Sequence, residues 1–101
     1  MVINELKSKL VELQKAKDME KLGVMRFYLS KVQNKEIELR PKGEKVTDEI
    51  AFKLLRKQVK ERKEGIEMYE KAGREESVQK EKRELEILRE FATMFPFELD
   101  L

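Results

Sequence analysis

Apolar residues recur at helical spacing along most of the chain, and only its last five residues alternate apolar and polar positions as a strand would. The longest periodic segment, residues 48–73, places apolar residues on one broad face and basic residues on the opposite face. The pattern predicts four helices, near residues 2–16, 19–39, 48–72 and 75–94. We therefore expect an all-α fold in which residues 1–101 form a single domain.

Start and stop signals separate the predicted helices. Asp18 and Thr47 precede the second and third helices as N-caps, because their side chains can accept a hydrogen bond from a free backbone N–H. Pro41 and Pro96 end the second and fourth helices, since proline cannot continue the hydrogen-bond ladder. Gly73 provides the left-handed residue of a short turn. The last two helices are therefore predicted to form a long antiparallel hairpin.

The helical faces also predict the core. The residues expected to be buried are apolar and face inward from three helices: Leu22, Met25, Leu29, Val32, Leu55, Val59, Ile66, Leu85 and Leu88. Val24 and Phe27 point to another side of the second helix, which a contact between two helices would leave uncovered.

Five of the last eight residues are large and apolar: Met94, Phe95, Phe97, Leu99 and Leu101. Water is an unfavourable environment for so much apolar surface. We expect these residues to fold back on the chain, with Val24 and Phe27 as the receiving surface. The alternative is a weak dimer formed through the same residues.

Charge is dense but nearly balanced, with 23 basic and 21 acidic residues and a net charge of +2. The chain has neither cysteine nor histidine, which excludes disulfides and removes the commonest catalytic bases and nucleophiles. The abundance of Lys and Glu is typical of heat-adapted proteins and of exposed helices. No segment has the composition of a membrane span or a secretory signal, so we expect a cytoplasmic protein.

Three charged residues fall on the apolar faces: Arg62, Glu36 and Glu81. Because a buried charge is costly unless it is paired, we expect Arg62 to meet Glu81, Glu36 or both. A structural ion pair that sets the register of the helices is the favoured interpretation. A perturbed catalytic carboxylate and an arginine that reaches out to solvent are the alternatives.

Five basic residues share one face of the third predicted helix: Lys53, Arg56, Lys57, Lys60 and Lys63. We call this set the basic strip. Its charge suits a nucleic-acid backbone, but no aromatic residue interleaves with it for base stacking. A solvated face paired with neighbouring acids is the commoner explanation of such a pattern, and nucleic-acid binding is the alternative.

No arrangement of residues predicts catalysis. The three serines lack the context of an activated nucleophile, and the four glycines form no phosphate-binding loop. The many carboxylates are better explained as solvated helix faces than as metal ligands. We therefore predict no catalytic residue, no metal site and no cofactor.

The segments MRFYLSKVQNKEIEL (25–39), KERKEGIEMYEKAGRE (60–75) and EKRELEIL (81–88) resemble the YqeY family. The resemblance implies an all-helical fold and a relationship to the tail region of the tRNA-dependent amidotransferase, a region that contacts tRNA. Members of the family usually continue from a Tyr-Leu-Pro stop into a second small helical domain. This chain instead reads FATMFP at residues 91–96, and we expect the second domain to be absent.

Three functions remain open at this point. The favoured one is a small helical accessory protein that binds tRNA or a translation-linked protein through the basic strip. The second is a component of glutamine-dependent tRNA amidotransferase, a carbon–nitrogen ligase, which the resemblance suggests and no residue supports. The third is a purely protein-binding helical module.

Overall fold

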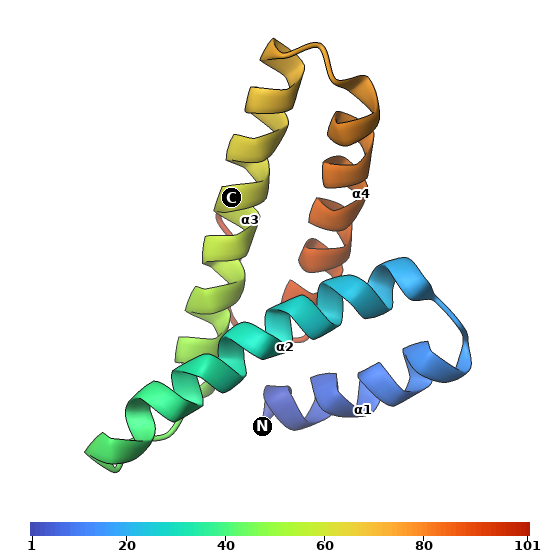
Figure 1. Cartoon of the computed structure of the whole chain (residues 1–101). Coiled ribbons are helices and arrows are strands. Elements are labelled where there is room, and N and C mark those ends of the chain that lie inside the picture. Colours follow the sequence, from blue (N-terminus) through green and yellow to red (C-terminus); the bar gives the residue numbers. More distant parts are fainter.

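A computed structural model describes all 101 residues and contains four α-helices and no strand (Figure 1). The helices are α1 (Val2–Lys15), α2 (Met19–Leu39), α3 (Asp48–Lys71) and α4 (Glu75–Ala92), with one 3₁₀ turn, η1 (Arg40–Lys42), after α2. Each helix begins and ends within two residues of its predicted bounds. The all-α prediction is confirmed. None of the helices combines the length and the apolar character that crossing a membrane requires.

The helices begin and end for the local reasons predicted. Asp18 Oδ1 accepts a hydrogen bond of 3.2 Å from the backbone N–H of Lys21, and Thr47 Oγ1 accepts one of 3.2 Å from Ile50. These bonds satisfy N–H groups that have no partner inside the helix. Gly73 has a φ of +69°, a left-handed conformation that glycine adopts without steric cost, and it allows the chain to reverse between α3 and α4.

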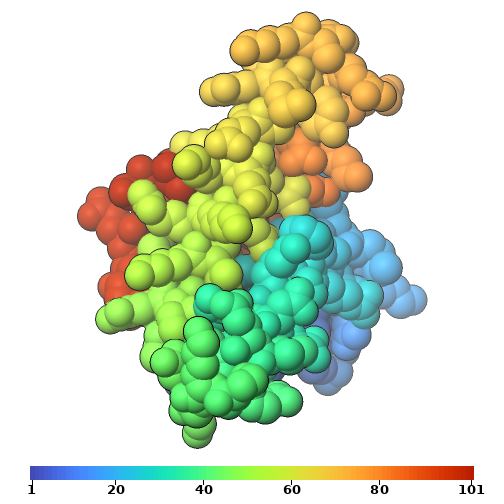
Figure 2. All heavy atoms as spheres, turned by 60° about the vertical axis from the view of Figure 1, so that its left-hand side comes forward, coloured from blue at the N-terminus to red at the C-terminus, as the bar shows by residue number.

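The four helices form two layers that cross (Figure 1). Helices α3 and α4 make the predicted antiparallel hairpin, and α2 lies across its base. Helix α1 returns along α2, so α2 is packed on two sides. The tip of the hairpin extends beyond α2 into solvent (Figure 2), and the molecule measures 47 × 31 × 24 Å.

The core lies where α2 crosses the hairpin. Tyr28, Leu55, Leu88 and Phe91 have no exposed surface there. The hydroxyl of Tyr28 donates a buried hydrogen bond of 2.7 Å to the carbonyl of Ala51, which fixes α2 against α3. Burial, with a smaller contribution from a neighbouring carboxylate, raises the pKa of Tyr28 well above its usual value.

Eight of the nine residues predicted for the core are buried. The exception is Leu29, which is partly exposed at the edge of the contact between α1 and α2. The predicted inward faces therefore describe the core well.

The last residues fold back on the chain, as predicted, but they pack on a different surface. The ring of Phe52 in α3 lies between Phe95 and Phe97, at centroid distances of 5.4 and 5.3 Å. The tail follows α3 in Figure 2. Antiparallel pairing brings the end of α4 beside the start of α3, so α3 is the surface within reach.

The prediction that Val24 and Phe27 receive the tail is wrong. Val24 is buried, because α2 is covered both by α1 and by the hairpin. Phe27 stays 48% exposed. The sequence pattern treated α2 as a helix with one partner, whereas it has two.

Candidate nucleic-acid interface

The basic strip is formed by consecutive turns of α3, because each of its members has another member three or four residues away. Lys53, Arg56, Lys57 and Lys60 are exposed, and Lys63 is partly buried. The opposite side of the same turns carries Leu55 and Val59 in the core. The amphipathic pattern of α3 therefore holds the strip outward on a rigid support.

Only one member of the basic strip has an acidic partner. Arg56 donates two hydrogen bonds, of 2.8 and 3.1 Å, to the two carboxylate oxygens of Asp100 in the tail. This contact lowers the pKa of the Asp100 carboxyl and raises the pKa of Arg56. Both side chains are well exposed, so the ion pair itself adds little to stability.

The four lysines of the basic strip form no salt bridge with any carboxylate of the chain. Neighbouring acids on α3, such as Glu61 and Glu64, remain unpaired with them. Beside the strip, Leu101 of the tail helps to line a hollow of about 300 Å³ together with Lys53, Arg56, Lys57 and Lys60. The tail therefore borders the strip and neutralises one of its five charges.

Arg62 is also basic and also on α3, but it lies toward α4 and is held inside the hairpin. Its Nη1 donates to Glu81 at 3.0 Å and to Glu84. The three side chains are only 15–22% exposed. The second partner, Glu84, was not predicted, although it lies three residues from Glu81 and therefore on the same side of α4.

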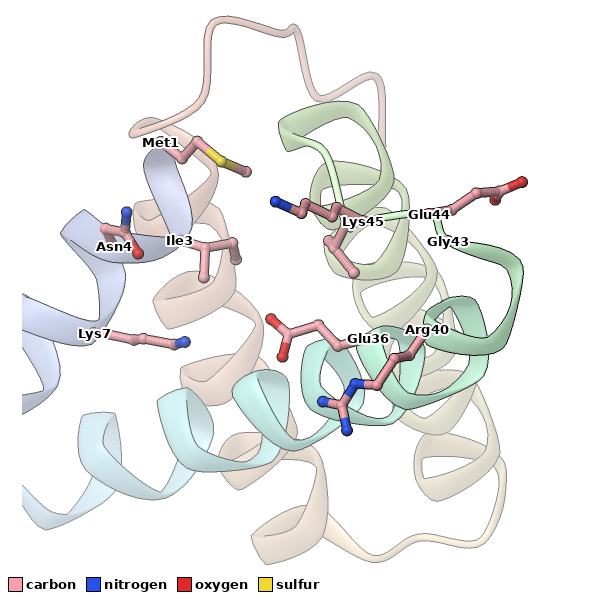
Figure 3. A pocket seen from close by; sticks show the side chains of 10 residues that line it. Met1, Ile3, Asn4, Lys7, Glu36, Arg40, Gly43, Glu44 and Lys45 are labelled. Atoms are coloured by element: carbon pink, nitrogen blue, oxygen red, sulfur yellow. The ribbon is translucent and has the colours of Figure 1, made fainter.

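Glu36 does not join this cluster. It lies in the second half of α2, whereas the first half of α2 approaches Arg62. Glu36 instead extends toward Lys7 in a hollow of about 450 Å³ that is lined by α1, the end of α2 with Arg40, and the loop that follows (Figure 3). Of the two partners expected for Arg62, Glu81 is therefore confirmed and Glu36 is not, because α2 crosses the hairpin at an angle and its far half points away.

The side-chain geometry favours ligand binding through the basic strip over nucleophilic chemistry. The hydroxyls of Ser8 and Ser30 donate to the backbone carbonyls of Asn4 and Phe27 in their own helices, so neither is oriented by a base. The strip presents cationic groups that can contact phosphate oxygens, and such contacts carry no direct information on the base sequence.

Two comparisons relate the chain to known proteins. The family model described as "Yqey-like protein" matches residues 3–99. An uncharacterized protein of Schizosaccharomyces pombe is 31% identical over 88 residues, which cover 85% of this chain and 68% of that relative.

Proposed function

Because the chain belongs to the YqeY-like protein family, we propose that it is a helical RNA-binding protein that holds structured RNA, with tRNA as the first candidate, on the basic strip. The observation that carries the proposal is the set of four lysines without an acidic partner. Exposed cations that the fold leaves unpaired remain available to phosphate groups.

The chemistry of the strip favours contacts with the RNA backbone over contacts with bases. No aromatic ring interleaves with the lysines on which a base could stack. Lysine is a flexible point charge, which suits phosphates whose spacing varies. The proposed binding therefore depends on the fold and charge of the RNA more than on its sequence.

Binding of tRNA at several salt concentrations tests this proposal, with fluorescence anisotropy as the readout. We expect the affinity to fall steeply as salt rises, because each phosphate contact releases condensed counterions. The double variant Lys57→Glu/Lys60→Glu should bind more weakly and reduce the slope of log affinity against log salt by about 2.

The matched control is Lys7→Glu/Lys82→Glu, which changes the net charge by the same amount on α1 and α4. This control should keep most of the affinity. Equal losses in both variants would show that only net charge matters, and an absence of salt-dependent binding in the unmodified protein would overturn the proposal in favour of protein binding.

A further inference from the structure

A second surface, independent of the basic strip, lies where α2 meets the hairpin. Two adjoining hollows, of about 540 and 260 Å³, share Phe27 and Arg62 as lining residues. We call the pair the hairpin groove, and its defining residues are Met19, Gly23, Phe27, Gln58, Arg62 and Gly65.

Gln58 is the first feature of the groove that points to a ligand. Its side chain is among the lining of the smaller hollow and is only 5% exposed. Both its amide nitrogen and its amide oxygen lack a hydrogen-bond partner. Buried amides in folded proteins are almost always paired, because an unpaired one loses its bonds to water without replacement. A complementary group would have to offer an acceptor and a donor side by side.

Gly23 and Gly65 are the second such feature. Both lie inside long helices, where glycine is less favourable than alanine. Neither has a positive φ, and a Cβ atom added to either would meet nothing within 4 Å. Internal packing therefore gives no reason for the missing side chains. Glycine in a helix does allow another backbone to approach closely from outside.

The charges and apolar side chains of the groove indicate the kind of occupant. Arg62 is already neutralised by Glu81 and Glu84, and Arg83 pairs with Glu20 at 3.0 Å. Most charged side chains of the groove are therefore paired within the protein. The groove has fewer free cations with which to bind phosphate than the basic strip has. A ligand with an uncharged surface is better suited to the groove. Two apolar side chains on this face of α2 are exposed: Met19 has 68% of its surface exposed and Phe27 has 48%.

We propose that the hairpin groove binds an amphipathic α-helix of a partner protein. Its apolar face packs on Met19 and Phe27, and its backbone passes close to Gly23 and Gly65. One amide or hydroxyl side chain of the helix pairs with Gln58. Both polar atoms of the Gln58 side chain are buried, so this pairing requires a rearrangement of the side chains that line the smaller hollow, Phe27 among them.

The first test uses the free protein. Gly23→Ala and Gly65→Ala should each raise the melting temperature, because alanine favours the helix and its methyl group meets no neighbour. Gln58→Met should also raise it, because an apolar side chain of similar size removes the unpaired amide. A lower melting temperature in these variants would show that the residues serve internal packing and would overturn the inference.

The second test uses a displayed library of amphipathic helices of about 18 residues with a randomised apolar face, selected on the full chain. The selected helices should shift the amide NMR signals of Gly23, Gln58 and Gly65, and should carry Asn, Gln, Ser or Thr at one position. They should bind Gly23→Leu/Gly65→Leu at least tenfold more weakly, and should bind Lys57→Glu/Lys60→Glu unchanged.

Several results would overturn the proposal: no enriched helix, equal binding to the leucine variant, groove signals shifted by tRNA instead, or self-association of the protein through the groove. If the leucine variant does not fold, as judged by circular dichroism, the alanine variants serve in its place. They should combine a higher melting temperature with weaker helix binding, which a purely structural role would not produce.

Discussion

Helix α3 carries basic residues on two sides, which differ in exposure and in the number of acidic partners. On the outer side, four lysines of the basic strip have no acidic partner, and Arg56 pairs only with the exposed tail. On the side toward α4, Arg62 has two carboxylate partners and is mostly buried. Leu55 and Val59 share this second side with Arg62 and are fully buried.

This difference distinguishes cations that hold the fold together from cations that remain free to bind a ligand. A cation whose partner lies in the same chain fixes the packing of two helices and has little left to offer a ligand. A cation that the fold leaves unpaired contributes little to stability and keeps its attraction for an external anion. Two kinds of variant, one on each side of α3, should therefore affect different measurements.

The largest expected effect comes from the apolar core on the inner side of α3. Leu55→Ala should lower the free energy of unfolding by about 2–5 kcal/mol, because it leaves a cavity beneath α2 and α4. Urea denaturation measures this loss. The neighbouring Leu54, which is only partly buried, provides the control, and Leu54→Ala should cost less. Equal costs would place the centre of the core elsewhere.

Breaking the buried ion pair should give the next largest effect. Arg62→Met should destabilise the protein by about 1–3 kcal/mol, because it strands two partly buried carboxylates. Combining it with Glu81→Gln and Glu84→Gln should recover part of this loss, since no charge is then left unpaired.

The matched change on the outer side, Lys60→Met, should leave the stability nearly unchanged. Strictly additive effects of the Arg62, Glu81 and Glu84 changes in denaturation experiments would mean that these residues do not act as a cluster.

Removing the tail should give a smaller loss. Deletion of residues 97–101 should cost about 1–2 kcal/mol, because Phe97 leaves the ring of Phe52. Thermal melts should show a loss that does not depend on protein concentration, as an intramolecular contact requires. A concentration-dependent loss would indicate a dimer, and no loss would mean that the tail is not held.

The smallest effect concerns pH. Since Arg56 lowers the pKa of Asp100 in the folded protein, the contribution of this contact is complete above the pKa of Asp100 in the unfolded chain. It is lost as the pH falls through the lower folded value. NMR signals of Phe97 should therefore report release of the tail in acid, and Asp100→Asn should abolish that transition. An identical acid transition in Asp100→Asn would assign it to another group.

The sequence predicted the local features of the fold well. Apolar spacing, the caps at Asp18 and Thr47, and the left-handed Gly73 each act within a few residues, so all four helices could be located. The contact between Arg62 and Glu81 could likewise be expected, because both charges fall on apolar faces of two helices that a short turn joins, and a buried charge needs a partner.

The predictions that failed depend on the angles between helices. The positions of Glu36, Val24 and the tail follow from how α2 crosses the hairpin and from its having two neighbours, and periodicity carries no information on either. The buried amide of Gln58 was missed for the same reason. On the helical wheel of α3 it lies between Ala51 and Leu54, inside the apolar face, but periodicity does not show that the neighbouring helices leave its amide without a partner.

The hydrogen bond from Tyr28 to Ala51 makes the absorbance of Tyr28 an intrinsic reporter of core opening. A phenol that is buried and donates to a carbonyl ionises less readily while α2 packs on α3, so its raised pKa couples phenolate absorbance to the opening of the core. In a Tyr69→Phe background, Tyr28 is the remaining tyrosine of a chain that has no tryptophan. An alkaline jump followed by absorbance would then time the separation of the two helical layers without any attached dye.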